Sequence, residues 1–140
     1  MIDKIILHLK GAPGSPFKMV HGSLSLALAQ ENPAQKVPAA WVFPSASAGI
    51  EVDSVSSDQV IMERIGLAIF MRSENDPVGD RKMDQLQVVR DWSRKTLIGY
   101  VPDRTSGEML ALSRGYLADF NNGGIWWVDE FQIKTYHQGG

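Results

Sequence analysis

Three carboxylates lie close together in the sequence, immediately before and at the start of a predicted helix: Glu74, Asp76 and Asp80. Carboxylate oxygens bind hard cations such as Mg²⁺ or Ca²⁺, so a metal site is one interpretation. The spacing is not that of an EF-hand loop, and Asp80 stands where an acidic side chain caps a helix or meets its dipole. We therefore expect no metal site, and interpret the cluster as a helix cap with solvated neighbours or as a charged contact to another subunit.

The remaining residues predict no catalytic set. The three histidines, His8, His21 and His137, are scattered and form no ligand-spaced pair. The chain has no cysteine, which excludes thiolate catalysis, disulfides and cysteine-ligated metals. It also has no G-x-S-x-G, and its GAPGSPFK segment lacks the G-K-[ST] ending of a phosphate loop. We expect neither an enzyme nor a bound cofactor.

Length and charge narrow the class of protein. The 140 residues fit one domain, predicted over 1–140, and a hydrophobic content of 44% is enough to bury a core. The net charge of −2 argues against a dedicated nucleic-acid binder, which usually carries a basic face. Without signal-peptide layout or a long apolar run, we expect a soluble protein that is not exported and has no membrane partner.

The first half of the chain predicts short elements and a loop. Apolar residues at 2, 5, 6 and 9 favour a short helix, and residues 17–20 a brief strand. The segment GSLSLALAQ fits a helix capped by Ser23 or a strand, and we favour the helix because Ala, Leu and Gln propagate helices well. Residues 37–43 predict a strand. The Ser-, Ala- and acid-rich stretch that follows, to Asp58, predicts a long loop or loose hairpin.

The second half carries the clearest patterns. Residues 60–71 predict a central strand, and 80–97 a long amphipathic helix ended by Gly99. Three strands follow over 109–114, 116–120 and 125–136, the last two joined as a hairpin by the turn-forming 121–124. The fold class is α+β: a mixed, largely antiparallel sheet of four to six strands, with one long and one or two short helices mainly on one face.

Two adjacent tryptophans mark the last strand. Because neighbouring strand residues point to opposite faces, Trp126 and Trp127 must differ in environment. Trp127 shares its face with Phe131 and Ile133 and is predicted to lie in the core. Trp126 is on the more polar face, where it is either covered within the subunit or exposed for a partner to bury.

This second half resembles the tail terminator proteins of long-tailed bacteriophages and related minor tail proteins. The likeness lies in the order of RIGLAIFMRS, the helix MDQLQVVRDWSRKTLIGYVP with its leucine–glycine–aromatic end, and the strand GGIWWVDEF near the C-terminus. It extends over roughly residues 38–137.

The resemblance implies a structural virion protein of the tail or neck. Such a subunit forms a ring, usually hexameric, that caps the tail tube, stops its polymerisation and joins it to the head-side connector protein. DNA passes through the pore without sequence-specific binding. The partners expected are therefore copies of the same chain, the tail tube protein and the connector. The alternatives are another neck or tail component, such as a head–tail joining protein or tube subunit, and more distantly a small enzyme.

Loops carried on a rigid sheet are the usual place for binding surfaces. We therefore expect the interfaces to use the loops 45–58 and 73–80 together with Arg81. The candidate interface residues are Asp58, Glu74, Asp76, Asp80, Arg81, Trp126 and Trp127.

Overall fold

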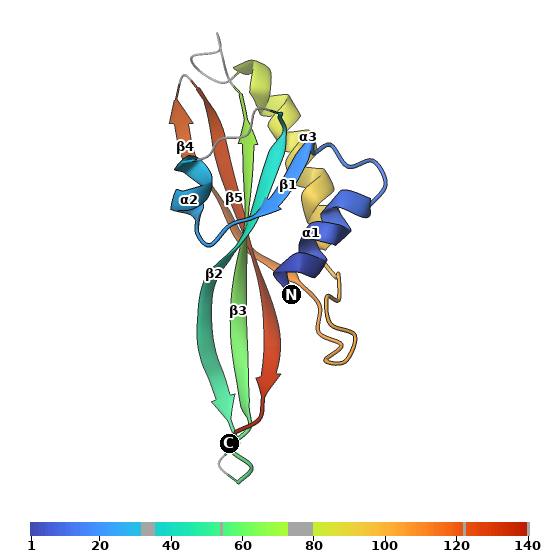
Figure 1. The fold of residues 1–140 in the computed structure, drawn as a ribbon, viewed down its shortest axis with the longest axis vertical. Coiled ribbons are helices and arrows are strands. Elements are labelled where there is room, and N and C mark those ends of the chain that lie inside the picture. Colours follow the sequence, from blue (N-terminus) through green and yellow to red (C-terminus); the bar gives the residue numbers. More distant parts are fainter. Residues whose placement is uncertain (32–35, 54, 73–79, 122, 140) are drawn as a thin grey trace.

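A curved five-stranded sheet with three helices forms the fold (Figure 1). The computed structural model describes residues 1–31, 36–53, 55–72, 80–121 and 123–139. The strand order is β1-β2-β3-β5-β4; β1 and β2 are parallel, and every other pair is antiparallel. The predicted α+β class with a mixed, largely antiparallel sheet is confirmed.

The segment predicted as a long loop is mostly strand. β2 runs over Ala39–Val52 and pairs with β3, Gln59–Met71, along nearly its whole length. Ser, Ala and Gly have low strand propensity, but here β3 supplies a regular hydrogen-bonding partner, and tertiary pairing overrides local preference. The alternative of a hairpin is therefore the correct one.

Two of the predicted strands are one. β4 runs over Ala111–Asn121 without the break predicted near Gly115, and pairs with β5, Gly124–His137. The predicted hairpin is confirmed, and the Asn121 side-chain oxygen accepts hydrogen bonds from the backbone N–H groups of Gly123 and Gly124 in its turn. The short β1, Met19–Gly22, pairs with only the first four residues of β2.

All three predicted helices are present: α1 (Ile2–Gly11), α2 (Leu26–Glu31) and α3 (Asp80–Leu97). The cap of α2 was wrongly placed, because Ser25 rather than Ser23 accepts the backbone N–H of Leu28. Gly99 has φ +86° directly after α3, the left-handed conformation that ends helices and favours glycine.

The sheet buries side chains on both faces. α1 and α3 cover one face, called the helix face here, over a core that includes Leu9, Leu67, Val89 and Phe131. α2 contributes Ala29 to a smaller core on the opposite face. No helix of the described residues is long and apolar enough to cross a membrane.

The two tryptophans lie on opposite faces of the sheet, as predicted, and differ in burial. Trp126 is buried in the smaller core, 5.2 Å between ring centroids from Trp41 and 4.7 Å from Phe70. Trp127 is only half-buried, at the margin of the helix-face core. Trp127 therefore packs against the core on the predicted face, with Phe131 and Ile133, but is only partly buried; Trp126 is covered within the subunit, which is one of the two outcomes left open by the sequence. Near the turn of this hairpin both faces of β5 are apolar. The polar residues that led to the expectation of a polar second face lie further along the strand.

Candidate assembly surface

A three-stranded arm extends away from the helices (Figure 1). We define the arm as residues 44–64 of the β2–β3 hairpin with 132–137 of β5; β3 lies in its middle. The β2 part, from Pro44 to Val52, is exposed along its whole length. β1 stops at the level of Val42, and β4 begins at the level of Gln132. Neither strand therefore covers an edge of the arm.

The tip of the arm is a turn organised by one carboxylate. The side chain of Asp53 accepts the backbone N–H of Val55 at 2.9 Å and that of Ser56 at 3.5 Å. These bonds, first that from Val55, hold the pKa of Asp53 below its usual range because they favour the charged form. Asp58 donates its backbone N–H to the Ser56 hydroxyl and closes the turn through its carbonyl, which accepts from the Asp53 N–H at 2.7 Å.

Apolar side chains stand exposed at the end of the arm. The exposed fractions are 47% for Ile50, 62% for Val52 and 94% for Val55. Glu51, Asp53 and Asp58 lie among them, whereas residues 43–58 include no lysine or arginine. The arm end therefore combines apolar contact area with negative charge, which suits contact with a partner better than it suits catalysis.

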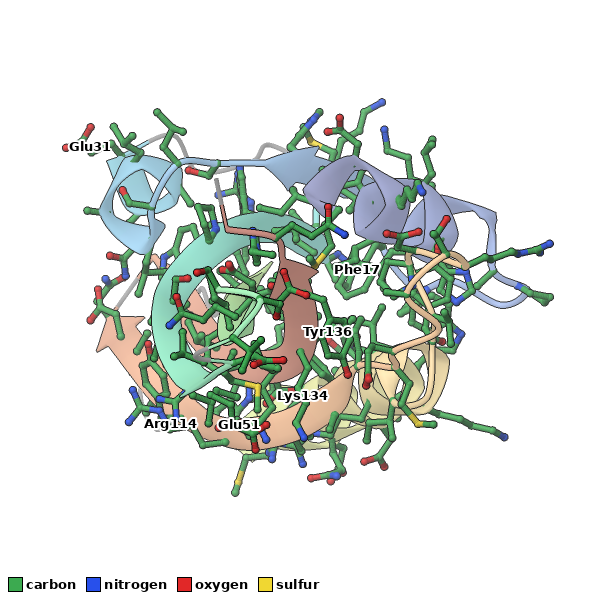
Figure 2. The ribbon with its side chains drawn as sticks, turned by 90° about the horizontal axis from the view of Figure 1, so that it is seen from below. Phe17, Glu31, Glu51, Arg114, Lys134 and Tyr136 are labelled. Carbon is green, nitrogen blue, oxygen red and sulfur yellow. The ribbon has the colours of Figure 1, made fainter. Side chains whose placement is uncertain are left out.

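The arm is tied to the loop before β4 close to its tip, because Tyr136 pairs with Val60 of β3. The Tyr136 hydroxyl donates a hydrogen bond to the Glu108 carboxylate, and Tyr136 is labelled in the view along the molecule in Figure 2. This bond, together with the negative charge of Glu108, raises the pKa of the Tyr136 phenol.

An ion pair joins α3 to β5 on the helix face of the sheet. Arg94 donates to both oxygens of Asp129, at 3.0 and 2.8 Å, and Trp127 Nε1 donates to the same carboxylate at 2.9 Å. Asp129 is fully buried, whereas the Arg94 side chain is 25% exposed. The hydrogen bonding of Arg94 to Asp129 is the main reason why the pKa of Arg94 is raised. The arrangement is structural, since every oxygen of Asp129 is occupied by a donor.

An aromatic–cation contact lies next to this pair. The Arg90 guanidinium sits 3.8 Å from the centre of the Trp127 ring. Burial, and then the positive charge of Arg94, lowers the pKa of Arg90. Its Nε is buried and, among the described residues, has no hydrogen-bond partner.

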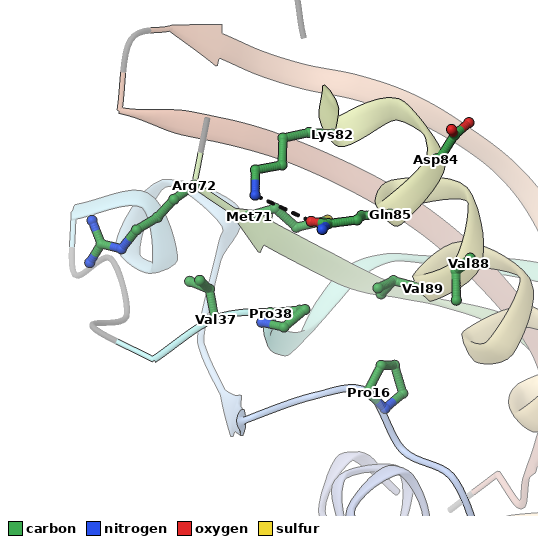
Figure 3. A pocket seen from close by; sticks show the side chains of 10 residues that line it. All are labelled: Pro16, Val37, Pro38, Met71, Arg72, Lys82, Asp84, Gln85, Val88 and Val89. Carbon is green, nitrogen blue, oxygen red and sulfur yellow. Dashed lines mark hydrogen bonds between the residues drawn. The ribbon is translucent and has the colours of Figure 1, made fainter. Parts of the chain in front are cut away.

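The cavities of the described residues hold no catalytic constellation. One of about 550 Å³ lies between the start of α3 and the segment at Pro38 (Figure 3). Its walls are largely apolar, and Lys82 Nζ donates to Gln85 Oε1 at 3.2 Å in its rim. The part of the chain that the structure describes also contains no group of three His, Asp or Glu side chains placed to hold a metal.

Comparison with known families matches residues 4–138 to the model of the phage tail terminator protein. The chain belongs to this family. No curated protein matches the sequence. Family membership confirms the resemblance drawn from RIGLAIFMRS, the long helix and GGIWWVDEF, and it makes the protein a structural, non-enzymatic component of a phage tail that interacts with the tail tube.

The structure locates only some of the interface residues predicted from sequence. Asp58 lies at the arm tip, Trp126 in the smaller core and Trp127 beside Arg90. Glu74 and Asp76 lie outside the described residues, and so do the side chains of Asp80 and Arg81, which begin α3. The predicted contact through this acidic cluster therefore stays a prediction.

Sequence reasoning selected residues 45–58 as an interface segment but did not recognise most of them as part of a long strand. The arm was read as a loop because its β2 half lacks β-branched and aromatic residues until Ile50 and Val52. In the predicted strand 125–136, Asp129 interrupts the apolar face that carries Phe131 and Ile133. A buried acid in such a position needs a cation, and Arg94, in the last turn of the predicted helix, is the residue that could have been proposed as its partner.

Proposed function

We propose that this chain forms a ring, expected to be a hexamer, that caps the tail tube, stops its polymerisation and joins it to the head-side connector. The observation that carries the proposal is the arm: a long three-stranded extension with apolar residues exposed at its end, on a chain of the tail terminator family. Exposed apolar side chains gathered at one end of a tail protein are best explained by burial against a neighbouring subunit.

The arm end is the surface that we assign to the tail tube protein. It has backbone pairing on both sides of β3 to keep it straight, and a turn fixed by Asp53. Its contact residues are therefore held in place before binding, which lowers the entropy lost on association. The opposite end of the subunit would then face the connector.

DNA would pass through the pore of the ring without sequence-specific binding. The net charge of −2 supports this role, because a strongly basic lumen would hold the DNA backbone. The finished protein would be located in the virion, at the junction of tail and head, after synthesis in the host cytoplasm.

Two measurements test the proposal. Native mass spectrometry of the purified chain should show one closed oligomer, and a protein that stays monomeric at high concentration would contradict it. Tube subunits polymerised with and without the chain should then be compared by negative-stain microscopy. A terminator stops growth at a single ring, whereas a tube subunit would itself assemble into long stacks.

The arm is tested with a matched pair of variants. Val52→Ser with Val55→Ser removes apolar groups from the arm end, and Leu7→Ser with Leu24→Ser removes them from other sites of similar exposure, 67% and 80%. We expect only the arm variant to lose its effect on tube length. Equal behaviour of the two variants would refute the assignment of the arm end to the tube.

A further inference from the structure

The sheet has two uncovered backbone edges of similar length. On one side, β4 is the last strand, and among the described residues nothing pairs with its outer edge. On the other side, β1 covers only Ala39–Val42, and no other strand of the described residues pairs with the rest of β2 on that side. Unpaired N–H and C=O groups in long edge strands are templates for pairing with another chain.

The directions of these two edges are compatible with cyclic assembly. β2 runs parallel to β5, because each is antiparallel to β3, and β4 runs antiparallel to β5. A neighbour related by rotation keeps its strand directions, so its β2 would approach β4 in antiparallel orientation. Joining one edge of a copy to the opposite edge of the next is a head-to-tail contact, and such contacts form a ring when the rotation between copies closes.

A groove beside the β4 edge offers apolar contact to an added strand. It has a volume of about 470 Å³ and lies between α3 and the helix face of β4. Leu117 and Met83 in its walls are 51% and 60% exposed. Arg90, whose buried Nε has no partner among the described residues, stands at its side with Trp127.

The uncovered part of β2 fits next to such a wall. Its residues from Ser45 to Gly49 are all small, so its backbone could approach β4 closely. Regular pairing is interrupted by bulges, and the undisturbed stretches are Ala46–Gly49 in β2 and Arg114–Leu117 in β4. Ser47 and Leu117 both lie on the helix face, so a continuous sheet would pair these two stretches with Ser47 opposite Leu117 or Gly115.

From these observations we infer that the outer edge of β4 and the groove beside it receive the uncovered edge of β2 from a second copy of this chain. The inference rests on the proposed ring and specifies how its subunits join. Because the free edge of β2 lies nearer the arm tip than β4 does, neighbouring copies are staggered along the strands. A staggered sheet closes on itself only if its strands are tilted relative to the ring axis.

Cysteine cross-linking tests this pairing, since the chain has no cysteine of its own. Residues that pair across neighbouring strands lie on the same face of the sheet. Ser47 pairs with Glu63, and Glu63 pairs with Ile133 of the helix-face core, so Ser47 lies on the helix face. Leu117 pairs with Trp127 and lies on the same face. Within one subunit these two positions are three strand spacings apart, about 14 Å, and are further separated along the strands. A bis-maleimide that spans about 8 Å, the distance to a diagonal neighbour, therefore joins them only between subunits.

The double variant Ser47→Cys/Leu117→Cys should give a covalent ladder that ends at the size of the ring. The control is Ala48→Cys/Leu117→Cys, because Ala48 pairs with Met62 and lies on the opposite face of the sheet. We expect little or no ladder from the control. Equal cross-linking of the two variants, or none in either, would overturn the edge pairing.

A second variant separates this inference from the proposed function. Leu117→Lys places a charge at the edge and should abolish the ring in native mass spectrometry while the melting temperature of the subunit is retained. Leu24→Lys, at an 80% exposed site away from β4, should leave the ring intact. A wild-type ring that survives Leu117→Lys would overturn the edge pairing alone, whereas a wild-type monomer would overturn the ring itself.

Discussion

Removing Arg94 should destabilise the subunit far more than removing the charge of its partner. In the variant Arg94→Met, the carboxylate of Asp129 stays fully buried and keeps only the N–H of Trp127. Breaking a buried ion pair by deleting one partner costs about 3–5 kcal/mol, because a buried charge is left uncompensated. For a domain of roughly this size, that corresponds to a loss of about 10 °C in melting temperature.

The variant Asp129→Asn instead leaves Arg94 without a charged partner, and Arg94 is more exposed than Asp129. The Arg94 side chain is 25% exposed and can turn its charge towards water, whereas Asp129 is completely covered. The amide still accepts one hydrogen bond, so the expected cost is about 1–3 kcal/mol, as for a lost buried hydrogen bond. The double variant Arg94→Met/Asp129→Asn should be more stable than Arg94→Met, because no charge remains in the core.

Urea unfolding followed by far-ultraviolet circular dichroism measures these free energies, with all variants at the same protein concentration because assembly also contributes to stability. The ordering expected is wild type, then Asp129→Asn, then the double variant, with Arg94→Met the least stable. Free energies that simply add in the double variant would show that the two side chains are not coupled. That result, or a change below about 1 kcal/mol for Arg94→Met, would refute the role given to the pair.

Three further predictions concern the sheet and the arm. Gly66→Ala should cost about 1–3 kcal/mol in urea unfolding, because the added Cβ would lie 2.2 Å from Cζ of Phe43; an unchanged midpoint would contradict the packing. Glu108→Gln should lower the raised pKa of Tyr136 towards its ordinary value, as measured by ultraviolet titration with Tyr136→Phe as the control. The hydrogen bond between Tyr136 and Glu108 contributes to stability at neutral pH, and this contribution is lost as the pH rises through the pKa of Tyr136. Asp53 has a lowered pKa, so its contribution to the stability of the arm tip is present at neutral pH and is lost as the pH falls through that pKa. NMR spectra of the wild type should therefore show the tip loosening in acid, and Asp53→Asn should abolish this response. An identical response in the variant would exclude Asp53 as its cause.

Sequence patterns were sufficient wherever an element's own residues decide its structure. α3 and its glycine terminator, and the β4–β5 hairpin with its Asn–Gly turn, were predicted from spacing and turn chemistry alone. The extension of β2 to Val52 was not, because residues 44–49 favour no strand by themselves. They are held by β3, whose own Ile61 and Met62 lie opposite Gly49 and Ala48. A strand specified by its partner cannot be recognised from its own composition.

Gly115 shows how a local rule can fail for a reason that concerns the candidate site. A glycine inside a strand pattern is usually a sign of a bulge, a break or a close approach. We interpreted it as a break, but it is a close approach: a Cβ at this position would lie 2.3 Å from Oδ1 of Asp129 and 2.6 Å from Nη2 of Arg94. The need for glycine arises from two side chains that are 14 and 21 residues away in sequence, so no local pattern could reveal it.

The same crowding connects the core to the surface that we propose for assembly. Gly115 belongs to the regular stretch of β4 that would pair with a neighbouring copy, and the ion pair behind it fixes α3 to β5 at the side of the groove. The position of the groove's two walls, α3 and β4, therefore depends on the Arg94–Asp129 contact. A surface that must match another backbone over several residues needs walls that do not shift on binding. A buried charge pair on an otherwise apolar sheet face is consistent with that need, since its directional hydrogen bonds fix an orientation that apolar contacts alone leave adjustable.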